Sequence, residues 1–182
     1  MIIAANKCDV LLEDNLWEKK LNDLKKRFPN YNIIPVMAEY EFNLKKASKN
    51  SILNYIPGDN KFEIKNEDQL NEIQKNGLNI IKNSLNKLNG TGVQNVLNSA
   101  VFELLKLKPI FPGGSKLEDK DGNVLPDCFL MKQNATALDF AYRLHSDFGD
   151  NFIKAIDIKT KRMVGKDHIL QFGDIIEIIS GK

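Results

Sequence analysis

The 182-residue sequence has only two cysteines and two histidines, and it has no long hydrophobic run. Cys8 and Cys128 lie far apart and outside any paired motif, so we expect no metal site and no disulfide framework, and we infer a reducing, cytoplasmic setting. No apolar run approaches the roughly 20 residues of a membrane span, so we expect no membrane association. The net charge of +2 is too small to indicate nucleic-acid binding by itself.

The sequence also lacks the residue combinations that perform catalysis. No Ser/His/Asp or Cys/His set has suitable spacing, so we expect no catalytic residue. His145 stands next to Asp147 and invites a catalytic role, but a structural role at a helix end is the alternative. The phosphate-binding pattern G-x-x-x-x-G-K-[ST] does not occur. Residues 119–122 match the magnesium motif D-x-x-G by letter only, and we interpret them as a hairpin turn.

The C-terminal third of the sequence alternates turn signals with short apolar runs, and one amphipathic segment lies among them. Prolines punctuate the first run and predict an edge strand or strand entry, because proline donates no backbone hydrogen bond. A helix is predicted from caps at 134–136 to a left-handed Gly149. One helix beside a small mixed sheet predicts an α+β β-grasp (ubiquitin-like) domain. The predicted strands cover 109–112, 128–131, 152–158, 163–164 and 175–179.

This segment resembles the TGS domain, which is named after threonyl-tRNA synthetases, GTPases and the stringent-response nucleotide synthetases. The matching residues keep their order and spacing over about seventy positions. The resemblance implies a binding module that contacts ribosomal or transfer RNA. The residues that carry it are 121–126, 144–149, 152–157 and 172–176.

Basic residues gather around a predicted hairpin tip in this segment. Basic side chains on a rigid turn suit contacts with phosphate groups, so we predict RNA binding there. A solvated hairpin tip is the alternative, because Asp157 and Asp167 lie close by in the sequence. The candidate RNA-binding residues are Lys154, Lys159, Lys161, Arg162 and Lys166.

The chain begins with a continuous apolar run over 1–5, which is typical of a buried parallel strand, and Asn6-Lys7-Cys8-Asp9 follows directly. These four residues resemble the NKxD motif of P-loop GTPases, which recognises guanine. The resemblance implies that the Asp9 carboxylate accepts two parallel hydrogen bonds from N1–H and the exocyclic amine of guanine, a donor pair that adenine lacks. It also implies that the aliphatic part of Lys7 lies over the purine face and that Asn6 ties neighbouring loops together. An Asp that caps a helix after a strand is the alternative.

A second strand, predicted at 31–36, ends at Met37, Ala38 and Glu39. Ligands of open α/β sheets bind at the carboxyl ends of the strands, so we place these residues beside the NKxD motif. In GTPases a Ser-Ala loop stands here, and its Ala N–H reaches the guanine carbonyl. The resemblance implies that role for Ala38, with Met37 in the place of Ser, and a plain turn is the alternative. Helices are predicted at 13–28, 41–50, 67–88 and from 91 onward.

As a whole, the sequence resembles the C-terminal half of translation-associated GTPases of the Obg superfamily, in the archaeal-type Obg-like branch. Further matching residues are 2–7, 54–59, 91–94 and 100–102. The resemblance implies an α/β fragment of a P-loop GTPase domain plus a helical segment, followed by a TGS domain. The expected domains are 1–56 for the GTPase part, 57–107 for the helical segment with the closing GTPase-domain helix, and 108–182 for the TGS domain.

The resemblance implies a GTP-binding fragment of a ribosome-associated GTPase, with GTP or GDP as ligand and Mg²⁺ only in the intact parent protein. Because the phosphate-loop pattern is absent, we expect this chain alone to bind GTP weakly and not to hydrolyse it. We also expect a truncated product that starts at an internal methionine. The alternative function is a non-catalytic RNA- or ribosome-binding TGS module. The sequence indicates no oligomeric state.

Overall fold

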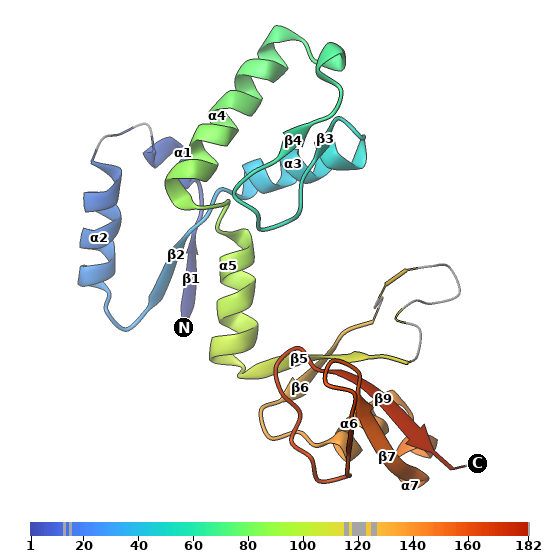
Figure 1. The fold of residues 1–182 in the computed structure, drawn as a ribbon. Helices are drawn as coiled ribbons and strands as arrows, with labels where there is room; N and C mark the ends of the chain where they lie inside the picture. Colours follow the sequence, from blue (N-terminus) through green and yellow to red (C-terminus); the bar gives the residue numbers. More distant parts are fainter. Residues whose placement is uncertain (13, 15, 115–116, 118–122, 125–126, 182) are drawn as a thin grey trace. The chain divides into compact units, whose positions relative to one another are not determined.

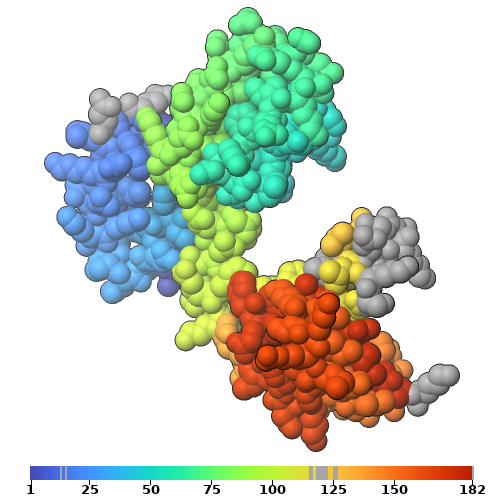
Figure 2. Space-filling model, viewed as in Figure 1, coloured from blue at the N-terminus to red at the C-terminus, as the bar shows by residue number. Residues whose placement is uncertain are grey.

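Two units make up the chain, Met1–Ala100 and Val101–Lys182. The first runs from blue to yellow-green and the second from yellow to red in Figures 1 and 2. The predicted hairpin at 119–123 and the D-x-x-G letters at 119–122 lie outside the described residues, apart from residue 123. The computed structural model describes residues 1–12, 14, 16–114, 117, 123–124 and 127–181.

Two parallel strands open the first unit. Strand β1 (Ile2–Ala5) pairs with β2 (Asn32–Pro35), and Ala5 stands opposite Pro35 at their carboxyl ends. The predicted parallel strand at the start of the chain is therefore confirmed. Its predicted burial is wrong, because the described residues form a sheet of only these two strands and Ala4 is exposed at its surface.

The helix predicted over 13–28 is present, but it is shorter than predicted and a separate short helix precedes it. Two helices, α1 (Cys8–Leu11) and α2 (Trp17–Arg27), connect the strands. Between them, an Asp14 carboxylate oxygen accepts a hydrogen bond of 2.8 Å from the N–H of Leu16. Such a local bond from a side chain to the backbone competes with helix formation, and it separates α2 from α1.

Helices and one short hairpin complete the first unit (Figure 1). Helix α3 (Ala38–Lys49) follows β2, and then strand β3 (Leu53–Asn54) pairs antiparallel with β4 (Glu63–Ile64). A 3₁₀ turn, η1 (Glu67–Gln69), leads to helix α4 (Glu72–Leu88). The buried cluster between these elements consists of Leu44, Leu53, Tyr55, Ile81 and Leu85.

The predicted helix over 67–88 starts five residues late, at Glu72. Asn71 and Gln74 form a capping box, in which each side chain accepts a hydrogen bond from the other residue's backbone N–H at 2.9 and 3.0 Å. A capping box defines the first residue of a helix because it satisfies N–H groups that have no partner within the helix. The predicted cap at the other end is confirmed, since Asn89 adopts a left-handed φ of 53°.

A tight turn at Thr91-Gly92 joins α4 to helix α5 (Val93–Asn98), which continues as the π-helical segment η2 (Ser99–Leu104). Gly92 has a φ of 80°, and a Cβ atom added there would lie 1.9 Å from the carbonyl oxygen of Pro35. Only glycine fits this position, because it tolerates the left-handed conformation and leaves room for the neighbouring backbone. The turn is therefore pressed against the carboxyl end of β2.

A five-stranded mixed sheet forms the second unit, in the order β6-β5-β9-β7-β8. Strands β5 and β9 are parallel, and the other neighbouring pairs are antiparallel. Helices α6 (Ala137–Leu144) and α7 (Ser146–Asp150) follow β6. The predicted small mixed sheet with one main helix is confirmed. The strands are β5 (Leu107–Pro112), β6 (Phe129–Lys132), β7 (Phe152–Asp157), β8 (Arg162–Val164) and β9 (Ile175–Ser180).

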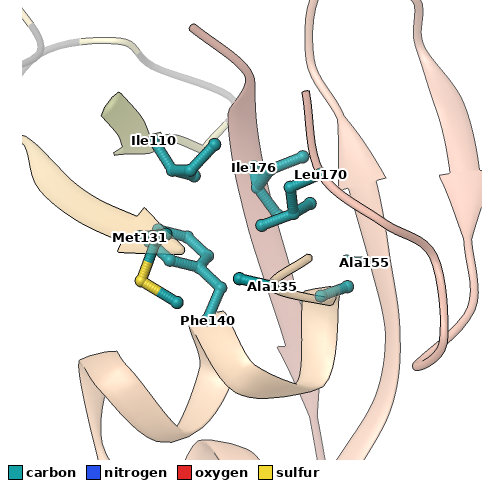
Figure 3. Close-up of a cluster of buried hydrophobic side chains, with 8 residues drawn as sticks. Ile110, Met131, Ala135, Phe140, Ala155, Leu170 and Ile176 are labelled. Carbon is teal, nitrogen blue, oxygen red and sulfur yellow. The ribbon is translucent and has the colours of Figure 1, made fainter. Parts of the chain in front are cut away.

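The core of the second unit lies between α6 and the sheet. Phe140 of α6 is fully buried, lies beside Met131 in Figure 3, and meets the ring of Phe129 edge to face at 5.9 Å between centroids. Burial of such a ring contributes about 2–3 kcal/mol. Helix α6 begins with a capping box between Thr136 and Asp139, as the predicted cap requires.

The predicted edge position of 109–112 is wrong, because β5 lies between β6 and β9. Pairing with β6 ends at Ile110, and pairing with β9 begins at Phe111, whose N–H donates toward β9. Backbone groups of alternate residues point to opposite neighbours. The backbone nitrogen of Pro109 therefore faces β9 at a position before the β5–β9 ladder starts. The backbone nitrogen of Pro112 faces β6 at a position after the β5–β6 ladder has ended. Neither proline removes a ladder hydrogen bond.

The predicted left-handed cap at Gly149 is wrong as well. Helix α6 ends at an extended His145, and Gly149 lies inside α7 without a positive φ. A Cβ atom added at Gly149 would lie 2.2 Å from Cδ1 of Tyr142. Glycine is needed there for close packing against that ring, not for its backbone conformation.

Two glycine substitutions test this description of the first unit. We expect Gly92→Ala to lower its stability by roughly 3 kcal/mol or more, because left-handed strain adds to the clash with Pro35. We expect Gly77→Ala to raise it by about 0.5–1 kcal/mol, because Gly77 lies inside α4 with no atom within 4 Å of an added Cβ. Urea unfolding followed by circular dichroism measures both. Equal effects of the two variants would contradict the packing of Gly92 against β2.

Candidate functional site

The Asn6-Lys7-Cys8-Asp9 motif lies directly after the carboxyl end of β1. The Val36 N–H donates to the carbonyl of Ala5 at 2.9 Å, and the Cys8 N–H donates to the carbonyl of Val36 at 3.1 Å. The side-chain oxygen of Asn6 accepts a hydrogen bond of 3.2 Å from the N–H of Ala38. Asn6 therefore ties the loop after β1 to the loop after β2, as the sequence predicted.

The loop after β2 is held from both sides. Met37 is fully buried against Cys8 and Leu12, and its N–H donates to the carbonyl of Thr91 at 2.8 Å. The side chain of Met37 is therefore part of the core, while Glu39 is exposed. The Ala38 N–H, which was predicted to face a guanine carbonyl, is bonded to Asn6 in this structure. A base bound here must share that donor or displace the Asn6 oxygen.

Asp9 and Lys7 lie at the start of α1. Lys7 is exposed, and its left-handed backbone occupies the N-cap position. Asp9 is half-buried in the first turn and does not cap the helix, which removes the capping alternative. It lines a pocket of about 210 Å³ together with Leu12, with Tyr40 of α3 and with residues of α4 that include Ser84. The other predicted nucleotide-binding residues do not line this pocket.

A buried hydrogen-bond network supports the loop after β2. Glu41 is 7% exposed, and its carboxylate accepts hydrogen bonds from the Tyr55 hydroxyl at 2.8 Å and from the Thr91 hydroxyl at 2.5 Å. The Tyr55 oxygen in turn accepts a hydrogen bond from the N–H of Gly58 at 3.3 Å. Two segments distant in sequence thus converge on the carboxylate of Glu41. The sequence does not reveal this network, because an isolated Glu near a helix start carries no signal of burial.

Burial determines the titration of two groups around the site. Desolvation, followed by the hydrogen bond to Glu41, raises the pKa of Tyr55 from 10.0 to about 12. Desolvation also raises the pKa of the Cys8 thiol, which donates to the carbonyl of Ala5 at 3.1 Å. Cys8 is therefore a protonated packing residue rather than a reactive thiolate.

The predicted RNA-binding residues surround the hairpin between β7 and β8. The Asp157 carboxylate accepts hydrogen bonds from the Lys159 N–H and from the hydroxyl of Thr160, at 2.9 and 2.6 Å. Lys161 adopts a left-handed φ of 58° at the tip. The hairpin is therefore a defined turn. Among the five candidates, Lys159, Lys161, Arg162 and Lys166 are exposed and Lys154 is half-buried.

Two of these lysines contact their own domain. The ammonium of Lys159 donates to the carbonyl of Gly173 at 2.5 Å, and that of Lys154 lies 3.2 Å from the sulfur of Met163. Burial raises the pKa of Asp157, but hydrogen bonds from Thr160 and the Lys159 N–H outweigh it and leave the pKa below its ordinary value. Asp157 thus serves the turn as a carboxylate acceptor.

Other groups in the described residues have structural roles. The Nδ1 atom of His145 accepts a hydrogen bond of 3.2 Å from the Asp147 N–H and caps α7, which is the predicted helix-end role. No group of three His, Cys, Asp or Glu side chains in the described part of the chain can hold a metal ion. No described helix is both long and apolar enough to cross a membrane.

Comparison with known proteins defines the class. Residues 4–114 match the family described as "Obg-like GTPase YGR210-like, G4 motif-containing domain", and residues 111–180 match the TGS domain. The chain thus joins the G4 part of an Obg-like GTPase to a TGS domain, and the predicted β-grasp fold at its C-terminal end is confirmed. More particularly, the chain belongs to the YGR210-like family of Obg-like GTPases, which confirms the predicted resemblance.

Individual relatives agree with this assignment. The chain is 45% identical over 182 residues to the uncharacterized GTP-binding protein MJ1332 of Methanocaldococcus jannaschii, covering 99% of this chain and 45% of that protein. A crystal structure of a GTP-binding protein from Pyrococcus horikoshii OT3 matches with a TM-score of 0.67 and 38% identity, over 100% of this chain and 46% of that one.

A more distant structure shares the fold. The YchF GTPase of Schizosaccharomyces pombe matches with a TM-score of 0.53 and 15% identity, over 98% of this chain and 42% of that one. The chain therefore spans about half the length of the relatives that it matches.

The hydrogen bond between Tyr55 and Glu41 leads us to expect that the stability of the fold falls at alkaline pH. Because the folded-state pKa of Tyr55 is raised from 10.0 to about 12, its contribution to stability is complete below pH 10 and declines as the pH rises toward 12. We expect Tyr55→Phe to remove the latest phase of the tyrosine absorbance titration and to flatten the loss of stability in this pH window. Tyr31→Phe, at an exposed position, is the control. A late phase that survives in Tyr55→Phe would contradict this assignment.

Proposed function

We propose that this chain contains the guanine-recognition part of a GTP-binding protein, with GTP or GDP as its ligand. The observation that carries the proposal is the hydrogen bond of 3.2 Å from the Ala38 N–H to Asn6. This bond joins the NKxD motif to the neighbouring strand end, the position where open α/β sheets bind ligands. The two relatives with higher identity are named GTP-binding proteins, which supports the same ligand.

Each residue of the proposed site has a distinct role. Asp9 accepts the N1–H and amine hydrogens of guanine, and the aliphatic part of Lys7 covers the purine face. Asn6 positions the second loop, and the Ala38 N–H points toward the guanine carbonyl once the base shares it. Met37 acts through its backbone, and Glu39 borders the loop. The buried hydrogen bonds of Glu41 with Tyr55 and Thr91 hold this loop in place.

Hydrolysis belongs, in our proposal, to the whole parent protein. The 182 residues contain no G-x-x-x-x-G-K-[ST] pattern, so phosphate contacts and Mg²⁺ are supplied by other residues of the parent. This chain alone contributes selection of the base, and its affinity for GTP is weak. We place the parent in the cytoplasm, in association with the ribosome.

Calorimetric titration with GDP and ADP tests base selection. We expect the chain to bind GDP and not ADP, because adenine lacks the donor pair that Asp9 reads. Asp9→Asn should lose GDP and gain xanthosine diphosphate. The reason is that the new amide can accept from N1–H and donate to the carbonyl that replaces the guanine amine. Glu18→Gln, an exposed change on α2, should leave GDP binding unchanged. Equal binding of GDP and ADP would refute the proposed site.

RNA binding by the TGS domain is a second candidate function. It is favoured by the defined hairpin, in which hydrogen bonds to Asp157 hold the turn while Lys161 and Arg162 are exposed at or beside its tip. A rigid basic turn loses little conformational entropy when it meets phosphate groups. The partner in this proposal is ribosomal or transfer RNA.

Charge reversal at the hairpin tests this second function. We expect Lys161→Glu combined with Arg162→Glu to weaken binding to transfer RNA. The slope of log K against the logarithm of the salt concentration should become shallower by about 1–2, which is about one for each lost phosphate contact. The combination of Lys45→Glu and Lys49→Glu on α3 is the charge-matched control. Filter binding over a salt series measures the slopes. The same slope in both double variants would count against the hairpin.

A further inference from the structure

Strand β6 lies at an open edge of the sheet in the second unit. In the strand order β6-β5-β9-β7-β8 it is the first member, and among the described residues it pairs only with β5. An edge strand of a sheet presents backbone N–H and C=O groups that can pair with another extended chain.

The hydrogen-bond pattern of β5 shows which backbone groups of β6 point outward. The carbonyl of Pro109 accepts from Gly173 and the N–H of Phe111 donates to Asp174, so these alternate residues face β9. The backbone groups of Lys108 and Ile110 therefore face β6, where Lys108 lies opposite Met131 and Ile110 lies opposite Phe129.

It follows that Met131 and Phe129 use their backbone groups for the ladder with β5. The backbone N–H and C=O of Leu130, which lies between them, therefore point away from β5 toward the open edge. The side chain of Leu130 is also 44% exposed, which is high for a leucine in a sheet.

A pocket of about 480 Å³ adjoins this edge. Leu130 and Lys132 of β6 line it together with Leu107 and Ala135, and Arg143 of α6 lines it from the helix. Its volume falls within the range of about 300–1,000 Å³ that is usual for ligand sites. The pocket thus combines an apolar surface, the outer edge of a strand and a neighbouring helix.

The charge of this pocket is positive on balance. Lys132 and Arg143 are both exposed. Asp139 also lines the pocket, but one of its carboxylate oxygens accepts hydrogen bonds from the N–H and hydroxyl of Thr136 at 2.8 and 3.0 Å. Neither cation has an ion-pair partner among the described residues, and two such cations beside a partly engaged carboxylate favour an acidic ligand.

We propose that the edge of β6 binds an extended segment of a partner protein, with apolar residues at its centre and carboxylates on its flanks. The segment adds to the sheet as a further strand. Its backbone pairs with Leu130, its apolar side chains contact Leu107 and Leu130, and its carboxylates meet Lys132 and Arg143. This interaction is independent of nucleotide binding by the first unit.

The probe is an acetylated, amidated hexapeptide with valines at its centre and glutamates on both flanks, titrated into the full chain. We expect saturable binding with a Kd below about 1 mM and a slower hydrogen exchange of the Leu130 amide, both measured by NMR. The same peptide with alternate amides N-methylated keeps its side chains but cannot pair as a strand. It should bind at least about tenfold more weakly. Equal binding of both peptides would overturn the proposal.

Leu130→Pro separates backbone pairing from side-chain contact. An outward N–H at a sheet edge is one of the few strand positions where proline is tolerated, so the variant should fold and lose peptide binding about tenfold, whereas Leu130→Val should keep it. If Leu130→Pro does not fold, Arg143→Glu takes its place and should also weaken binding, with Lys82→Glu on α4 as the charge-matched control.

Four results would overturn the proposal. They are binding that is unchanged in folded Leu130→Pro, binding that is unchanged in Arg143→Glu, amide shifts centred on the β7–β8 hairpin, and no saturable binding of the peptide. Self-association of the chain through β6, detected by concentration-dependent sedimentation and abolished by Leu130→Pro, would assign the edge to a second copy and would also overturn it.

Discussion

The buried carboxylate of Glu41 is the constraint on which the first unit depends. A carboxylate on a residue that is only 7% exposed is costly unless hydrogen-bond donors satisfy it, and the hydroxyls of Tyr55 and Thr91 are those donors. The position of Thr91 then places its carbonyl against the Met37 N–H and sets Gly92 against the end of β2. The loop that meets Asn6 is therefore positioned by a polar interaction beneath it, and the apolar cores fill the space around that interaction.

A buried lysine has a comparable role in the second unit. Lys108 is 2% exposed, and its ammonium donates to the carbonyl of Gln133 at 2.8 Å and to the carbonyl of Leu170. Burial lowers the pKa of Lys108, and the charge of Asp174 opposes that shift. The lysine joins β5 to the loops that contain Gln133 and Leu170, and in the described part of the chain it forms no ion pair. Among the described residues, each unit thus contains one buried residue of a charged type, Glu41 or Lys108, which forms hydrogen bonds with neutral groups.

Local signals account for the parts of the fold that could be predicted. Asn89 ends α4 and Thr136 begins α6 because their caps depend on nearby backbone groups alone. The NKxD motif was recognisable for the same reason, since its chemistry needs a few residue types at fixed spacing. The predictions failed at positions whose structure depends on packing or pairing with other helices and strands. Gly149 packs against Tyr142, and the prolines of β5 fit between two ladders of different extent.

The sequence by itself determined the family and the two kinds of fold, because these depend on residue type and order, and it also led to the prediction of which residues read guanine. Only the tertiary structure decided that Ala38 donates to Asn6, that Met37 belongs to the core and that Glu41 lies beneath the site. The same holds for the open edge of β6, which follows from the order of strands in the sheet. These features arise from pairings between residues far apart in the chain, and local sequence carries no record of such pairings.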